Sequence, residues 1–156
     1  MKLSSQDIPE GDYHGVPSGW RKEDIIALHK QLHGTYSIYT PQPENVVAPS
    51  HISDRFNWLE YRNTLHKIGD GISVGDKACI EIASNYIVFN YFGSYSGFIR
   101  ERFARLLKNQ ELTKQQAKRL QKHFKTLRES GQCFQEFRIY SKLNKRLIDV
   151  FGDVNT

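Results

Sequence analysis

The stretch DKACIEIASNYIVFNY, residues 76–91, decides the fold class of this 156-residue chain. Its apolar side chains recur every three or four residues, which is the period of an amphipathic helix. Residues 86–92 are also rich in β-branched and aromatic side chains, a composition typical of a strand. Because the helical period runs without a break from Ala78, we expect a central buried helix over residues 76–91, with a strand over residues 86–92 as the alternative.

The same spacing recurs on both sides of this stretch and predicts an all-α protein. Thr113 followed by Gln116 is a capping-box pattern that opens one of the flanking segments. At this length, residues 1–156 are expected to form one domain, a single-domain bundle of about five helices. The flanking helical segments are residues 21–33, 54–68, 98–108, 113–129 and 134–150. The residues expected to be buried together are Ile82, Tyr86, Phe103, Leu120 and Phe124.

Two segments lack the helical period. Residues 1–18 are rich in Gly, Pro, Asp and Ser, and they predict a mobile N-terminal tail. Residues 35–53 carry Pro41, Pro43 and Pro49, and each proline disfavours the helical conformation in the residue before it. A long proline-containing loop is therefore expected there, and loops of this length are usually functional or disordered.

The composition excludes several classes of protein. The two cysteines, Cys79 and Cys133, fit neither a disulfide framework nor the spacing of a zinc motif. The opening residues MKLSSQDIPEG lack the apolar region of a signal peptide, and no run of 18 apolar residues could span a membrane. We therefore expect a cytoplasmic protein that does not associate with membranes.

Positive charge is concentrated in the C-terminal part of the chain. Residues 1–97 hold 8 Lys/Arg against 11 Asp/Glu, whereas residues 98–156 hold 14 against 6. On a helical wheel, the basic residues of each of the last two segments form a row opposite the apolar side. The first basic row is Lys114, Lys118, Lys122 and Lys125, and the second basic row is Arg138, Lys142, Lys145 and Arg146. Arg100 and Arg105, on the preceding segment, are expected to extend this surface.

Two functional hypotheses follow from these rows. Like charges four residues apart destabilise a helix by a few tenths of a kcal/mol, and a phosphate-rich partner would neutralise them. The leading hypothesis is a non-enzymatic protein that binds RNA or DNA backbones, as a subunit of a nucleoprotein assembly. The alternative is a protein-interaction module, such as an adaptor, inhibitor or immunity-type protein, whose basic face docks on an acidic partner. A solvated surface without a partner explains the rows equally well.

Short patterns that resemble reactive sites are incomplete. His29 and His33 have the spacing of HExxH zinc sites, but Lys30 stands where the glutamate would be, and no third ligand is evident. GSYSG, residues 93–97, has Tyr95 instead of serine at the central position of a nucleophile elbow. It is better explained as a turn in which Ser94 or Ser96 caps the next helix.

The acidic residues between the second and third helical segments offer no clearer site. Residues 69–76 contain Gly69, Gly71 and Gly75, which predict a turn, and they do not match GxGxxG, so dinucleotide binding is unsupported. Asp70, Asp76 and Glu81 could hold a cation, but a linker and a helix start explain them better. We therefore predict no catalytic residues, no metal site and no cofactor, and we favour a protein that is not an enzyme.

Overall fold

The computed structural model describes residues 15–39, 54–93, 95–131 and 136–154, and every regular element within these ranges is a helix. The predicted all-α fold is therefore confirmed, and the described ranges contain six helices, one in each segment with helical spacing, close to the predicted count of about five. The helices are α1 (Lys22–Gln31), α2 (Asp54–Ser73), α3 (Lys77–Phe89), α4 (Ser96–Leu107), α5 (Lys114–Glu129) and α6 (Phe137–Phe151).

The two segments without helical period lie mostly outside the described residues. The mobile tail and the proline loop therefore stay predictions for residues 1–14 and 40–53. Residues 15–18, at the end of the expected tail, pack on the domain instead of extending from it. The Tyr91 hydroxyl donates a hydrogen bond to the Gly15 carbonyl at 2.6 Å, and Val16 contacts the core.

The decisive stretch forms the helix α3, and the alternative of a strand over residues 86–92 is wrong. Asp76 begins the helix, because its side chain accepts a hydrogen bond from the Ala78 backbone N–H at 3.1 Å. Asn90 ends the helix in the left-handed conformation, with φ of 55°. Asparagine tolerates this conformation better than most residues, so the helix ends at Phe89, two residues before the expected boundary at Tyr91.

Helix α2 continues beyond the predicted end at Ile68, through two glycines that the sequence suggests as a turn. Both glycines serve close packing. A Cβ atom on Gly69 would lie 2.0 Å from the Arg102 guanidinium of α4, and one on Gly71 would lie 2.3 Å from Cys79 Sγ of α3. The absent side chains let α3 and α4 approach α2, and this approach outweighs the low helix propensity of glycine.

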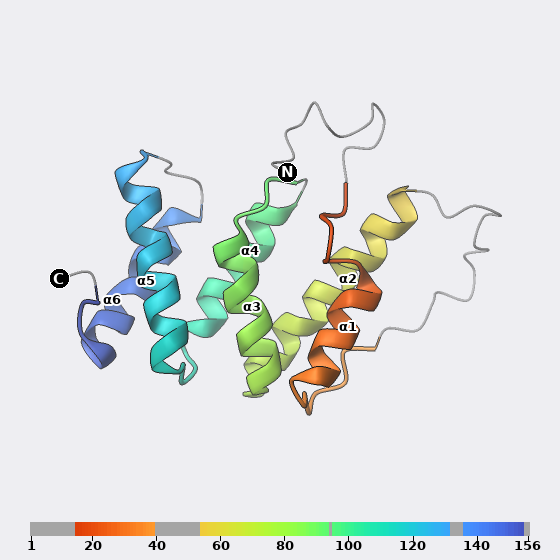
Figure 1. The fold of residues 1–156 in the computed structure, drawn as a ribbon, viewed down its shortest axis with the longest axis horizontal. Coiled ribbons are helices and arrows are strands. Elements are labelled where there is room, and N and C mark those ends of the chain that lie inside the picture. The colour runs from red at the N-terminus through yellow and green to blue at the C-terminus, as the bar shows by residue number, and fades with distance from the viewer. Residues whose placement is uncertain (1–14, 40–53, 94, 132–135, 155–156) are drawn as a thin grey trace.

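The helices are arranged as three pairs side by side in two layers (Figure 1). One layer contains α1, α3 and α5, and the other contains α2, α4 and α6. Within the described residues, each helix contacts only helices that lie one or two positions away along the chain. The central helix α3 contacts α1, α2, α4 and α5, whereas α5 and α6 form one end of the array.

A continuous apolar core runs through all three pairs. Helix α3 contributes the fully buried Ile82 and Tyr86, and the Tyr86 ring lies 5.7 Å from the Phe103 ring of α4. The predicted burial of all five core residues is confirmed, since Leu120 and Phe124 of α5 are also buried. None of the described helices has the combination of length and apolar character needed to cross a membrane.

Candidate functional site

All eight side chains of the two basic rows are exposed. The first basic row lies on α5, opposite buried residues such as Leu120 and Phe124, and the second lies on α6, opposite buried residues such as Leu143 and Leu147. Among the described residues, one ion pair involves these rows, between Lys125 and Glu129 at 3.9 Å. The rows are therefore largely free of neutralising carboxylates within the described part of the chain.

Helix α5 is fixed at its N-terminus by the predicted capping box. The Thr113 hydroxyl accepts a hydrogen bond from the Gln116 backbone N–H at 3.1 Å, and the Gln116 side chain accepts one from the Thr113 backbone N–H at 2.9 Å. Both contacts satisfy backbone donors that a helix start leaves without partners. Because this cap and the buried Leu120 set the rotation of α5, they also set the direction of the first basic row.

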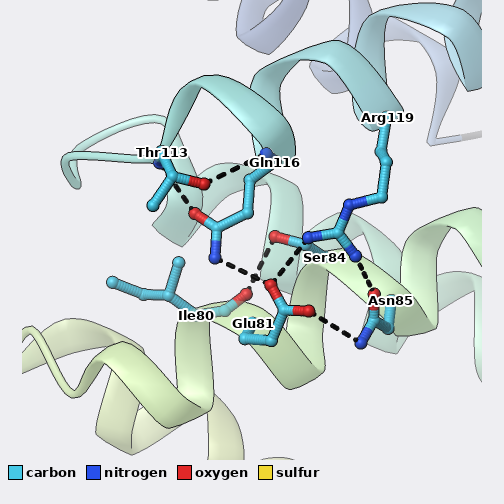
Figure 2. Close-up of polar contacts among 7 residues, drawn as sticks. All are labelled: Ile80, Glu81, Ser84, Asn85, Thr113, Gln116 and Arg119. Atoms are coloured by element: carbon cyan, nitrogen blue, oxygen red, sulfur yellow. Dashed lines mark hydrogen bonds and ion pairs between the residues drawn. The ribbon is translucent and has the colours of Figure 1, made fainter.

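A polar network then joins α5 to α3 (Figure 2). Glu81 of α3 accepts hydrogen bonds from Gln116 at 2.9 Å and from Arg119 at 2.7 Å, and Asn85 donates to its other oxygen at 3.2 Å. Burial raises the pKa of the Glu81 carboxyl, but the bonds from Arg119, Gln116 and Asn85 outweigh it and hold this pKa below its usual value. Arg119 is thus matched by a carboxylate, unlike most of the first basic row.

The asymmetry of charge along the chain becomes an asymmetry between helix pairs. Helices α5 and α6 together carry ten Lys/Arg against two Asp/Glu. Helices α1 and α2 carry five of each, and α3 and α4 carry four Lys/Arg against two Asp/Glu. Net positive charge therefore increases from one end of the array to the other.

Arg100 corrects the expectation that it extends the basic surface. Its side chain is 2 % exposed and forms an ion pair with Glu136 at 2.8 Å, where Glu136 is equally buried. It also donates to the Tyr91 carbonyl and lies over the Phe92 ring. Arg100 therefore joins α4 to the start of α6 and cannot reach a partner in solution. Arg105 is exposed, as expected, but pairs with Glu101 at 2.6 Å.

A groove lies where α5 and α6 meet. It has a volume of about 510 Å³, and a hollow of about 220 Å³ shares Arg128, Asn144 and Ile148 with it. The larger space is also lined by Lys125, and the smaller one by Lys145. One member of each basic row thus lines one of these two adjoining spaces. The carboxylates that line the larger space are Glu129 and Asp153.

Arg128 and Asn144 are groove residues that the sequence analysis did not identify. Asn144 Oδ1 is buried and has no hydrogen-bond partner among the described residues. Its signal in the sequence is its position midway between Tyr140 and Ile148, four residues from each, where a helix facing a neighbour usually carries apolar residues. Arg128 lies three residues after Lys125 and so borders the first basic row.

His123 is a further polar group on α5, and its side chain is half-buried. Its Nε2 atom is buried without a hydrogen-bond partner among the described residues, and its ring lies 6.4 Å from the Tyr140 ring of α6. Burial, with a smaller effect of the Arg100 charge, lowers the pKa of His123 to about 4. His123 is therefore neutral at pH 7 and adds nothing to the charge of the rows.

The remaining candidates are separated by the fold. His29 is buried and forms a 2.7 Å contact with Asp76, while His33 has a φ of 60° after the end of α1 and is not part of that contact. Asp70 pairs with Arg102 and Glu81 with Arg119, so the suggested cation site of Asp70, Asp76 and Glu81 does not form.

The GSYSG segment also differs from its expected role. Tyr95 is the N-cap of α4, and the Ser96 hydroxyl instead holds the preceding turn through the carbonyl groups of Tyr91 and Gly93. The suggestion that Ser94 caps the helix lies outside the described residues.

No protein-family model, curated protein or solved structure matches this chain in the comparisons made with each. The positions and charges of the residues described above therefore carry the functional inference.

Proposed function

We propose that this protein binds the phosphate backbones of nucleic acids through the exposed basic rows of α5 and α6, without catalysing a reaction. The observation that carries the proposal is the exposure of eight Lys/Arg side chains at one end of the array, of which only Lys125 has a carboxylate partner among the described residues. Such side chains gain affinity by releasing counterions condensed on the phosphates.

The dimensions of the first basic row suit a nucleic-acid backbone. Lys114 and Lys125 are eleven residues apart on one helix, which corresponds to about 16 Å along its axis. One strand of duplex DNA advances about 3.4 Å per phosphate, so the row spans roughly five nucleotides. The two rows lie on helices of different layers, and the groove lined by Lys125 adjoins the hollow lined by Lys145.

The alternative is a protein partner with a mainly acidic surface. The two carboxylates near the basic rows favour a protein over a nucleic acid. Glu129 follows the first basic row, and Asp149 lies beside the second on the exposed side of α6. A nucleic-acid backbone would be repelled by both groups, whereas a protein surface of mixed charge could match them. Salt dependence separates the two partners, because backbone binding has a steep slope that does not depend on sequence.

The test is the affinity for labelled duplex and single-stranded oligonucleotides, measured by fluorescence anisotropy from about 50 mM salt upward. In the triple variant Lys118→Gln/Lys122→Gln/Lys125→Gln, each lost contact should lower the slope of log K against log salt by about 0.9 for duplex or about 0.7 for single strands. We expect the slope to flatten by about 2–3 for unrelated sequences alike.

A matched control removes the same charge from the helices that do not carry the basic rows. Lys30→Gln/Lys67→Gln/Lys77→Gln changes three lysines on α1, α2 and α3 and should leave the slope unchanged. Absence of measurable binding by the unmodified protein at about 50 mM salt would refute the proposal. Equal flattening by both triple variants would show that total charge, and not the rows, drives binding.

A further inference from the structure

Three side chains of different chemistry converge in the interior where α1 meets α3. His29 lies near the end of α1, Asp76 caps α3, and Cys79 lies in the first turn of α3. Asp76 Oδ2 is 2.7 Å from His29 Nε2 and 3.2 Å from Cys79 Sγ, and the three donor atoms all lie within 4.8 Å of one another. All three residues are buried.

The fold brings these atoms together across a long stretch of chain. His29 and Asp76 are 47 residues apart, and the Tyr36 backbone N–H donates to the same Asp76 oxygen at 3.1 Å. The backbone approaches them closely. A Cβ atom on Gly34 would lie 2.0 Å from His29 Nε2, and one on Gly71 would lie 2.3 Å from Cys79 Sγ. Two glycines therefore form the walls that hold the donor atoms in place.

We propose that His29, Asp76 and Cys79 bind a divalent transition metal ion, with Zn²⁺ as the first candidate. Imidazole nitrogen, carboxylate oxygen and thiolate sulfur are the three donor types that proteins use for Zn²⁺. These three side chains leave one position of a tetrahedral centre for a ligand from outside the chain.

The two donor separations around Asp76 are close to those of a tetrahedral centre. Metal–ligand bonds of about 2.0–2.3 Å place neighbouring donors about 3.3–3.7 Å apart. The observed contacts of 2.7 Å and 3.2 Å around Asp76 therefore need to open by less than about 1 Å. Such an opening exchanges hydrogen bonds for bonds to the metal and leaves the helices in place.

Charge balance favours the same occupant. A carboxylate and a thiolate neutralise a divalent cation, so the loaded centre has no net charge, which a buried site requires. Binding replaces the Cys79 thiol proton, which leaves to solvent, and moves the remaining imidazole proton of His29 to Nδ1. Without metal, burial and the neighbouring Asp76 raise the pKa of the Cys79 thiol, so it is not a reactive thiolate and a nucleophilic role is disfavoured.

The experiment titrates chelator-treated protein with Co²⁺ and then with Zn²⁺. Co²⁺ bound to a thiolate gives a ligand-to-metal charge-transfer band in the near ultraviolet, and competition with Zn²⁺ removes this band. We expect one equivalent of Co²⁺ to bind with the band present. Cys79→Ser should remove the band and weaken binding about tenfold or more.

Matched controls change Cys133, the second cysteine of the chain, and His33, the second histidine of the HKQLH segment. Cys133→Ser and His33→Asn should keep the band, and asparagine tolerates the positive φ of residue 33. Failure of the unmodified protein to bind one equivalent would overturn the proposal, as would a band that persists in Cys79→Ser or disappears in Cys133→Ser.

Circular dichroism of each metal-free variant shows whether it folds. If Cys79→Ser does not fold, X-ray absorption of the unmodified protein with Zn²⁺ decides the question. One sulfur with nitrogen and oxygen neighbours supports the site, and nitrogen and oxygen alone refute it.

Discussion

The junction of α1 with α3 and the end formed by α5 and α6 use polar residues in opposite ways. At the junction, His29, Asp76 and Cys79 are buried and satisfy one another. At the end, the basic rows are exposed, and Lys125 alone has a carboxylate partner among the described residues. Both regions bury apolar side chains in one continuous core. Apolar packing therefore stabilises the whole array, and the two regions differ in whether their polar side chains are buried or exposed.

The largest effect should come from the buried ion pair that anchors α6 to α4. Glu136→Ala leaves the Arg100 guanidinium buried without its carboxylate, and we expect a loss of about 3–5 kcal/mol in the free energy of unfolding. Glu101→Ala breaks the exposed pair with Arg105 and should cost less than about 1 kcal/mol. Urea unfolding measures both, and equal losses would show that burial does not distinguish the two pairs.

Core truncation tests whether the two ends are equally well packed. Leu120 of α5 and Leu65 of α2 are both fully buried, so each change to alanine should cost about 2–5 kcal/mol. A loss below about 0.5 kcal/mol for Leu120→Ala alone would mean that α5 is rotated from the position described. Such a result would also place the first basic row elsewhere.

The pH dependence of the unfolding free energy should include a contribution from His123, at the end formed by α5 and α6. The pKa of His123 is about 4 in the folded protein and near 6.5 when unfolded, so its contribution is complete above pH 6.5 and disappears as pH falls to about 4. Because the side chain is partly exposed, we expect about 1–2 kcal/mol from this group. His123→Gln should flatten the curve of unfolding free energy between these pH values, and an unchanged curve would contradict the lowered pKa.

The smallest effect concerns the basic row itself. The variant Lys118→Gln/Lys122→Gln/Lys125→Gln should unfold at the same temperature or slightly higher, because like-charge repulsion of a few tenths of a kcal/mol is relieved. Differential scanning calorimetry at low salt measures this change. Clear destabilisation would mean that these lysines hold the fold together instead of facing solvent.

The sequence predicts the features that depend on local patterns. Helical spacing identifies the buried faces of α3 and α5, and the pair Thr113 and Gln116 identifies the start of α5. The exposure of both basic rows follows from the same spacing, because side chains opposite an apolar face point to solvent.

Long-range partners explain what the sequence does not predict. In the sequence, Arg100 resembles the basic residues near it. In the structure, it is buried because it pairs with Glu136, 36 residues later. Gly69 and Gly71 predict a turn from the sequence, but in the structure they lie within α2 and allow α3 and α4 to pack closely against it. His29 has the spacing of a pair with His33, whereas its partner Asp76 belongs to another helix. In each case, tertiary packing determines the role of the residue, and the neighbouring sequence does not.

The restriction of helix contacts to near neighbours along the chain has a kinetic consequence. Among the described helices from α2 to α6, contacts between helices one or two positions apart keep the loops that must close short, whereas α1 reaches α3 across a long segment. Proteins dominated by local contacts fold in microseconds to milliseconds. During folding, each outer helix pair can pack on a neighbouring pair that has already formed, so structure can propagate from α3 toward either end. We expect amide hydrogens of α5 and α6 to exchange sooner than those of α3, because an end pair can open while the centre of the array stays closed.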